Sequence, residues 1–273
     1  MMNGRIMKIE EEELILENAL NFYENGKINE AIALFNKISD NNCTAQFCLG
    51  EIYWNDEIEG TDNSSLALFW YGKAAENGNG LAQLWLGNNY CIGIKSDPNP
   101  ELAVYWYSKA AKQNMALAQY HLGICYATGW GVDQDESKTN ELMTLAANNN
   151  FFDADLYILE HTRRTDPHNI DAKRTALEEK YNKQLTTDSK TLLKYVKYLI
   201  DIIGTSYENE LGFSLLINSK LLKTEECRIL LAHCYEYGIG TELDINKACD
   251  ILRDLANVSK KAKSKLIVLE NKL

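Results

Sequence analysis

The chain has 273 residues and a formal net charge of −11, and its acidity is concentrated at the N-terminal end, where residues 1–60 hold twelve acidic and four basic side chains. An acidic chain without a face rich in Lys and Arg is poorly suited to phosphate groups, so nucleic acid and anionic membranes are disfavoured as partners. No apolar run precedes the first acidic residues, and no later stretch is long and apolar enough for a membrane span; neither a signal peptide nor a membrane helix is expected.

The seven cysteines are an odd number, and their spacing does not place one partner on each helix of a pair. Disulfides form in oxidising compartments and are rare in the cytosol. We therefore expect reduced thiols and a cytoplasmic protein.

The first 43 residues predict a helical hairpin. Residues 11–25 carry an apolar stripe, Gly26 ends that helix, and residues 28–38 form a second amphipathic helix. Tyr23 and Ala31 stand where a hairpin of the tetratricopeptide type needs an aromatic residue and a small one. We expect this hairpin to cap the array that follows.

A Leu-Gly pair then recurs at a fixed spacing. Its leucines are Leu49, Leu86 and Leu122, in steps of 37 and 36 residues, and a related segment returns at Leu231. The 109 residues between Leu122 and Leu231 correspond to three further steps of about 36. This period predicts one continuous all-α solenoid of about six to seven helix pairs, each pair burying its apolar face against its neighbours.

Each unit follows the same plan of helix A, a polar loop and helix B. Helix A ends at a glycine, which adopts positive φ without steric cost. The helices B at 66–78 and 102–114 contain alanine pairs that allow close approach, with Trp70 and Trp106 beside them. The helix B at 137–150 keeps the alanine pair and has Leu142 in place of the tryptophan.

The motif fades after residue 150, although helices are still expected at 153–164, 171–185, 192–203 and 210–222. Pro167 makes residues 165–170 an irregular joint, and residues 260–273 predict a closing helix. The predicted organisation is a capping hairpin over 1–43, three well-formed repeats over 44–150, degenerate helical repeats over 151–222, and a last repeat with a C-terminal capping helix over 223–273.

The best copy of the motif, residues 118–135, contains Gly123, Tyr126, Gly129, Gly131 and Asp135. This pattern resembles the Sel-one-like repeat family, relatives of the tetratricopeptide repeats, and the clear resemblance covers residues 44–150 and 224–258. It implies a right-handed superhelix of antiparallel helix pairs whose concave face, lined by helix A, holds a protein partner.

The groove positions that the resemblance implies flank the Leu-Gly and Tyr landmarks. They are Phe47, Glu51, Trp54, Leu84, Asn88, Cys91, Tyr120, Ile124, Thr128, Ile229, His233, Glu236 and Tyr237. The alternative is a core between repeats for the apolar Phe47, Leu84 and Ile229. For Glu51, Asn88 and Glu236 the alternative is solvated surface.

Chemistry at a metal or nucleotide site is not expected. His121 and Cys125 lie four residues apart on one helix, and His233 adjoins Cys234, but no further ligands converge on either pair, so packed thiols are favoured over zinc. The Tyr-x-x-Gly-x-Gly loops lack the Gly-Lys-Ser/Thr of a phosphate loop, and helix termination explains their glycines. We expect no cofactor, no metal and no catalytic residues.

These observations favour a non-enzymatic scaffold or adaptor that binds a protein partner in its groove. The alternative is a bacterial immunity protein that neutralises a cognate secreted toxin, a role in which this family also serves. The acidic N-terminal third favours a basic target. An enzyme with its site around His121 and Cys125 is the third hypothesis.

Overall fold

The computed structural model describes residues 2–55, 63–93, 97–203 and 206–271, and the side chains of residues 10–55, 63–93, 97–200 and 207–271. Within these ranges all regular structure is helical, as the sequence predicts, and no helix is long and apolar enough to cross a membrane. The chain divides into two compact units, Met1–Ala154 and Asp155–Leu273. The boundary between the units falls where the Leu-Gly motif fades.

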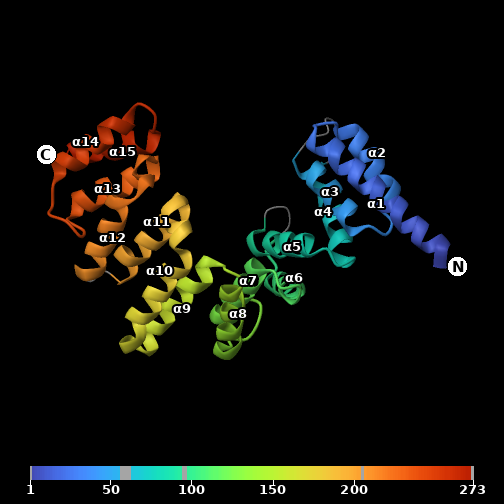
Figure 1. The fold of residues 1–273 in the computed structure, drawn as a ribbon, viewed down its shortest axis with the longest axis horizontal. Coiled ribbons are helices and arrows are strands. Elements are labelled where there is room, and N and C mark those ends of the chain that lie inside the picture. Colours follow the sequence, from blue (N-terminus) through green and yellow to red (C-terminus); the bar gives the residue numbers. More distant parts are fainter. Residues whose placement is uncertain (1, 56–62, 94–96, 204–205, 272–273) are drawn as a thin grey trace. The chain divides into compact units, whose positions relative to one another are not determined.

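The N-terminal unit is a series of helical hairpins (Figure 1). Its helices are α1 (Met2–Glu24), α2 (Ile28–Ile38), α3 (Cys43–Trp54), α4 (Asn63–Glu76), α5 (Gly80–Ile92), α6 (Pro100–Lys112), α7 (Ala116–Thr128) and α8 (Glu136–Asn148). Each odd-numbered helix packs against the helix that follows it, and each even-numbered helix from α2 to α6 packs against the next odd one. The odd helices are thus the predicted helices A, and the even ones the helices B.

The C-terminal unit contains the degenerate repeats and the last clear one. Its helices are α9 (Phe152–Thr165), η1 (Pro167–Asn169), α10 (Ile170–Thr187), α11 (Ser189–Lys197), η2 (Tyr198–Ile203), α12 (Ser206–Asn218), η3 (Lys220–Lys223), α13 (Glu225–Tyr237), α14 (Ile245–Ala256) and α15 (Lys260–Glu270). The expected joint at Pro167 is the 3-10 turn η1, and η2 is a π-helical extension of α11.

The repeat register is kept across the degenerate region. The first residue of α13 lies 109 residues after the first residue of α7, and the same separation holds for their last residues. One expected helix differs: α12 spans Ser206–Asn218 instead of 210–222. Ser219 is extended and its side chain accepts from the Leu221 N–H at 3.0 Å, which ends α12 early and starts the 3-10 turn η3.

The glycine of each Leu-Gly pair lies at a close contact between helix A and its own helix B. A Cβ atom placed on Gly87 would lie 2.5 Å from the ring of Tyr107, and one on Gly50 would lie 2.8 Å from the ring of Tyr71. In the third repeat Gly123 faces the side chains of Met143 and Leu142.

The alanine pairs near the ends of the helices B are buried except for Ala111, which is partly exposed. Ala74, Ala75, Ala110 and Ala146 have no exposed surface, and the next helix A packs against α4 and α6. A methyl side chain lets two helices approach closely, and Trp106, only 9% exposed, fills the space nearby as predicted.

The two glycines of each Tyr-x-x-Gly-x-Gly loop have different roles. Gly129 and Gly238 are left-handed C-caps of α7 and α13, with φ of 73° and 66°. Gly131 and Gly240 also have positive φ, but a Cβ there would lie 2.5 Å from the carbonyl carbon of Pro100 or of Asn209, respectively, on the preceding helix B. Helix termination alone, which the sequence suggests, is therefore an incomplete explanation.

The aspartate that closes the motif caps helix B. The side chains of Asp135 and Asp244 accept from the backbone N–H groups of Lys138 and Lys247, both at 2.9 Å. Asn99 does the same for Leu102 at the start of α6. A side-chain oxygen here satisfies an N–H that has no partner within the helix.

Candidate partner-binding surfaces

The predicted groove positions of the N-terminal unit lie on α3, α5 and α7. We call the surface formed by the partly or fully exposed side chains of these three helices the A-helix face. Its most prominent feature is a group of aromatic rings from three helices. The ring of Trp54 meets the ring of Trp85 edge-on at 4.8 Å between centroids, and Trp85 stacks on Tyr71 at 4.0 Å. Phe47 also contacts Tyr71, with ring centroids 5.6 Å apart. Both tryptophans remain partly exposed.

The next repeat places a smaller version of this group one step along the unit. His121 stands 36 residues after Trp85 and stacks on Tyr107, with ring centroids 5.2 Å apart. Burial lowers the pKa of His121 below its usual 6.5, while the charge of Asp153 acts in the opposite direction. Tyr120 contacts Phe151 at 5.1 Å. Aromatic rings thus lie on this face in both repeats.

Two polar groove residues are held in place by the tyrosines of helix B. The Tyr71 hydroxyl donates to the Glu51 carboxylate, and the Tyr107 hydroxyl donates to Asn88 Oδ1 at 2.9 Å. Burial raises the pKa of both tyrosines far above its usual value, so the hydroxyls stay protonated donors. Glu51 and Asn88 are therefore oriented side chains, unlike freely solvated ones.

The remaining predicted residues divide by exposure. Cys91, Thr128 and Tyr237 are exposed, and Leu84, Ile124, His233 and Glu236 are partly buried. Ile229 is 7% exposed and belongs to the core of the C-terminal unit, which supports its alternative assignment and removes it from the accessible surface. Residues 229, 233, 236 and 237 all lie on α13, so the predicted set divides between the two units.

Sequence reasoning missed Trp85 and His121, although both are on the A-helix face. The signal was present, because an aromatic ring occupies this repeat position at Trp85, His121 and Tyr157, in steps of 36. The predicted groove set takes the residue two before the leucine and the residue after the glycine of each Leu-Gly pair, and it omits the residue directly before the leucine.

The cysteines behave as packing residues. All seven fall within the described residues and are free thiols, and five of them are buried. Burial raises the pKa of Cys125 to about 11, which makes its thiolate a rare species at neutral pH. In the part of the chain that the structure describes, no group of three or more His, Cys, Asp or Glu residues is arranged to hold a metal ion.

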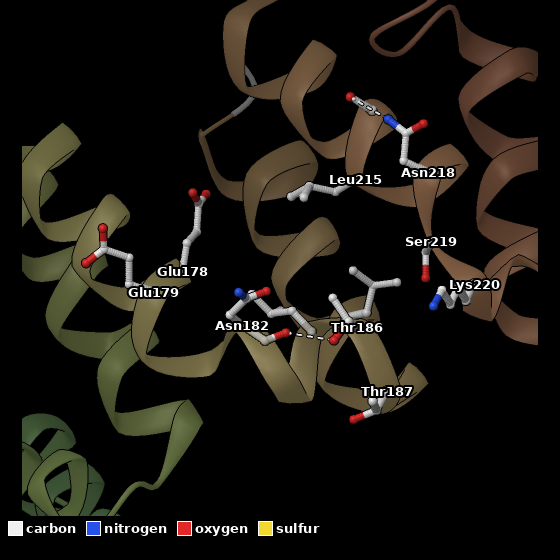
Figure 2. Close-up of a pocket in the computed structure, with 12 residues that line it drawn as sticks. Glu178, Glu179, Asn182, Thr186, Thr187, Leu215, Asn218, Ser219 and Lys220 are labelled. Carbon is white, nitrogen blue, oxygen red and sulfur yellow. Dashed lines mark hydrogen bonds between the residues drawn. The ribbon is translucent and has the colours of Figure 1, made fainter.

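The C-terminal unit contains a groove of about 680 Å³ between α10 and α12 (Figure 2). Its lining consists of Glu178, Glu179, Asn182, Leu185, Thr186, Thr187, Leu192, Ser214, Leu215, Asn218, Ser219 and Lys220. The buried residues of α10 are Arg174, Leu177, Tyr181 and Leu185, so this helix B has no buried alanine pair.

Antiparallel helix pairs that repeat about every 36 residues define a helical-repeat protein of the solenoid class. The family model of the Sel1 repeat matches residues 44–79, 80–115, 116–151 and 226–253. The chain therefore belongs to the Sel1 repeat family, whose members are typically scaffolds for protein–protein interaction. No curated protein matches the chain.

Two solved structures share the fold. A Sel1 repeat protein from Oxalobacter formigenes is 23% identical with a TM-score of 0.65, and the match covers 94% of this chain and 76% of that one. A protective antigen present in uropathogenic Escherichia coli strains, which displays the same repeat fold, is 20% identical with a TM-score of 0.64. That match covers 89% of this chain, which spans about half (52%) of the antigen's length.

Proposed function

We propose that this protein is a non-enzymatic scaffold that holds a protein partner on the A-helix face of its N-terminal unit. The observation that carries the proposal is the pair Trp54 and Trp85, which are partly exposed and in edge-to-face contact. Tyr71, which stacks on Trp85, also donates to the carboxylate of Glu51. Rigid aromatic side chains dominate the energetics of protein interfaces, and the tyrosines of helix B hold the polar groups in fixed positions beside them.

The charge of the unit supports a basic partner. Residues 1–154 hold 21 acidic and nine basic side chains, whereas residues 155–273 hold 18 and 19. A Lys or Arg of the partner would be attracted by both the tryptophan ring faces and the Glu51 carboxylate. We expect association to be faster at low ionic strength and to slow as salt is added.

The immunity role is a second candidate that this charge distribution favours, since a cognate toxin with a basic surface would fit the same unit. The adaptor and immunity roles differ in the partner's effect on cells. Expression of the isolated partner should arrest growth, and co-expression of this protein should restore it, only if the partner is a toxin.

A pull-down with matched variants tests the binding surface. Trp54→Ala should lower the affinity for the recovered partner by about 2 kcal/mol or more, as expected for an aromatic residue at the centre of an interface. The control is the double variant Phe69→Ala/Tyr105→Ala. It removes two exposed aromatic side chains from the helices B: Phe69 on α4 (51% exposed) and Tyr105 on α6 (48% exposed). Thermal melting verifies that both variants fold.

The opposite pattern of binding would contradict the proposal. If Trp54→Ala binds as the wild type does while the variant on α4 and α6 loses the partner, binding occurs on the helix B surface.

A further inference from the structure

The groove between α10 and α12 has polar walls and an apolar floor. Asn182 and Thr186 lie on the α10 side and Asn218 on the α12 side (Figure 2). Ser214, one turn before Asn218 on α12, also lines the groove. Leu185, Leu192 and Leu215 supply the apolar lining, and Leu192 and Leu185 belong to the buried core, with exposures of 1% and 8%. A ligand that fits must therefore combine hydrogen-bonding groups along its sides with an apolar group facing the floor.

The spacing of the polar side chains matches an extended peptide. On each wall the two side chains are four residues apart, which is about 6 Å along an α-helix. An extended chain repeats its backbone groups on one side every two residues, or about 6.6 Å. Asn218 Nδ2 donates to Ser214 Oγ at 3.2 Å, which leaves its second N–H and its carbonyl oxygen to pair with a backbone.

The two ends of the groove carry charges of opposite sign. Glu178 and Glu179 lie toward one end, and Lys220, which follows α12, lies at the other; these are the only charged residues of the lining (Figure 2). Glu178 is held in place because its carboxylate accepts from the Tyr195 hydroxyl at 2.5 Å. From Glu179 to Thr187 the α10 helix advances about 12 Å, which is the length of about four extended residues.

We infer that this groove binds an extended peptide segment of about five residues. The segment carries Lys or Arg at the end that meets Glu178 and Glu179, an apolar side chain over the leucines, and Asp or Glu at the end that meets Lys220. This site is independent of the A-helix face, so either surface can bind while the other does not.

A random heptapeptide library displayed on phage is the probe that tests the site. It is panned on the full-length wild type, on Ser214→Trp, which fills the groove with a large side chain, and on Ser264→Trp. Ser264 is an equally exposed serine on α15 outside the groove and provides the matched control. Wild type and Ser264→Trp should enrich peptides in which a basic and an acidic residue flank an apolar one.

The affinity of the best synthetic peptide, measured by fluorescence anisotropy, should fall more than tenfold for Ser214→Trp and stay unchanged for Ser264→Trp. Melting curves establish that both proteins are folded. Failure to enrich any peptide, or enrichment that Ser214→Trp does not abolish, overturns the inference.

A charge exchange tests the direction. Glu179→Lys combined with Lys220→Glu should weaken the selected peptide about tenfold, and exchanging the two charged residues of the peptide should restore its affinity. If the exchanged peptide binds the double variant no better than the original peptide does, the assigned polarity is wrong. Both substituted side chains are exposed, so the variant is expected to fold normally.

Discussion

The two units of the molecule make different polar contacts from the same position of helix A. In the N-terminal unit the buried residues Gln46, Gln83 and Gln119 recur in steps of 37 and 36. The Gln83 side chain donates to the carbonyl of Ala75 at 2.9 Å, at the end of the preceding helix B, and accepts from Gln113 at 2.9 Å, just after its own helix B. Gln46 and Gln119 make the same two contacts in their repeats.

The C-terminal unit has charged residues at two of the positions where this ladder of amides would continue. Asp155 stands 36 residues after Gln119 and accepts from Lys180 Nζ at 2.8 Å and from the Tyr181 hydroxyl at 2.7 Å. Arg228, which stands 109 residues after Gln119, pairs with Asp254 at 2.9 Å. Neutral buried amides make contacts that neither salt nor pH disturbs, whereas partly exposed ion pairs are screened by salt.

Both units share the close approach of a loop glycine to the preceding helix B, and substitutions at these glycines should have the largest effect. Gly131→Ala and Gly240→Ala should each lower the free energy of unfolding by roughly 3 kcal/mol or more, because the added methyl group meets backbone and the φ is positive. Gly26→Ala is the control: its φ is +71° but nothing lies within 4 Å, so about 1 kcal/mol is expected. Urea denaturation measures all three, and equal losses for Gly131 and Gly26 would contradict the close approach.

A second pair of variants sharpens the comparison between repeats. Gly87→Ala should cost roughly 2 to 3 kcal/mol, because the new Cβ meets the rigid Tyr107 ring. Gly123→Ala should cost less, since its nearest neighbour is the flexible end of Met143 at 2.9 Å. The last repeat carries Ala232 and Leu252 at these positions, so Tyr107→Leu should rescue part of the loss in Gly87→Ala. Double-mutant cycles in urea provide the measurement.

The amide ladder and the ion pairs can be compared directly. Gln83→Met leaves the Ala75 carbonyl without its donor in a buried place and should cost about 2 kcal/mol at any salt concentration. Arg228→Met removes a pair whose side chains are 27% and 71% exposed, and less than about 1 kcal/mol is expected, falling further in 1 M salt. A similar salt dependence for both variants would remove the distinction between the units.

The smallest expected effect is a pH dependence of the N-terminal unit. Burial lowers the folded-state pKa of His121 below the unfolded value of 6.5, so the unfolded chain binds the proton more tightly. The stability contributed by neutral His121 is complete above pH 6.5 and is lost as the pH falls through the folded pKa. His121→Phe, which keeps a ring against Tyr107, should remove this part of the pH dependence in melting curves recorded from pH 8 to pH 5.

Much of the helical architecture could be predicted from the sequence. The Leu-Gly period, the alanine pairs and the loop glycines predict the helix pairs of residues 44–150, and the 109-residue spacing predicts α13. The groove positions could be predicted only in part, because the motif shows which residues share a helix but not which of them the next helix covers. Ile229 is the clearest example: its repeat position indicates a surface, and the packing around α13 buries it.

What the sequence by itself determined is local and periodic: each helix follows from residues three or four apart, and its end from a glycine or a capping aspartate. What only the tertiary structure decided depends on residues 20 to 31 apart in the chain that meet across helices. The contact of Gly87 with Tyr107, the amide ladder through Gln83 and the closeness of Gly131 to Pro100 are all of this kind. The groove beside α10 also depends on tertiary structure, because a cavity forms where side chains do not fill the space between helices. The sequence pattern of a single helix does not predict that space.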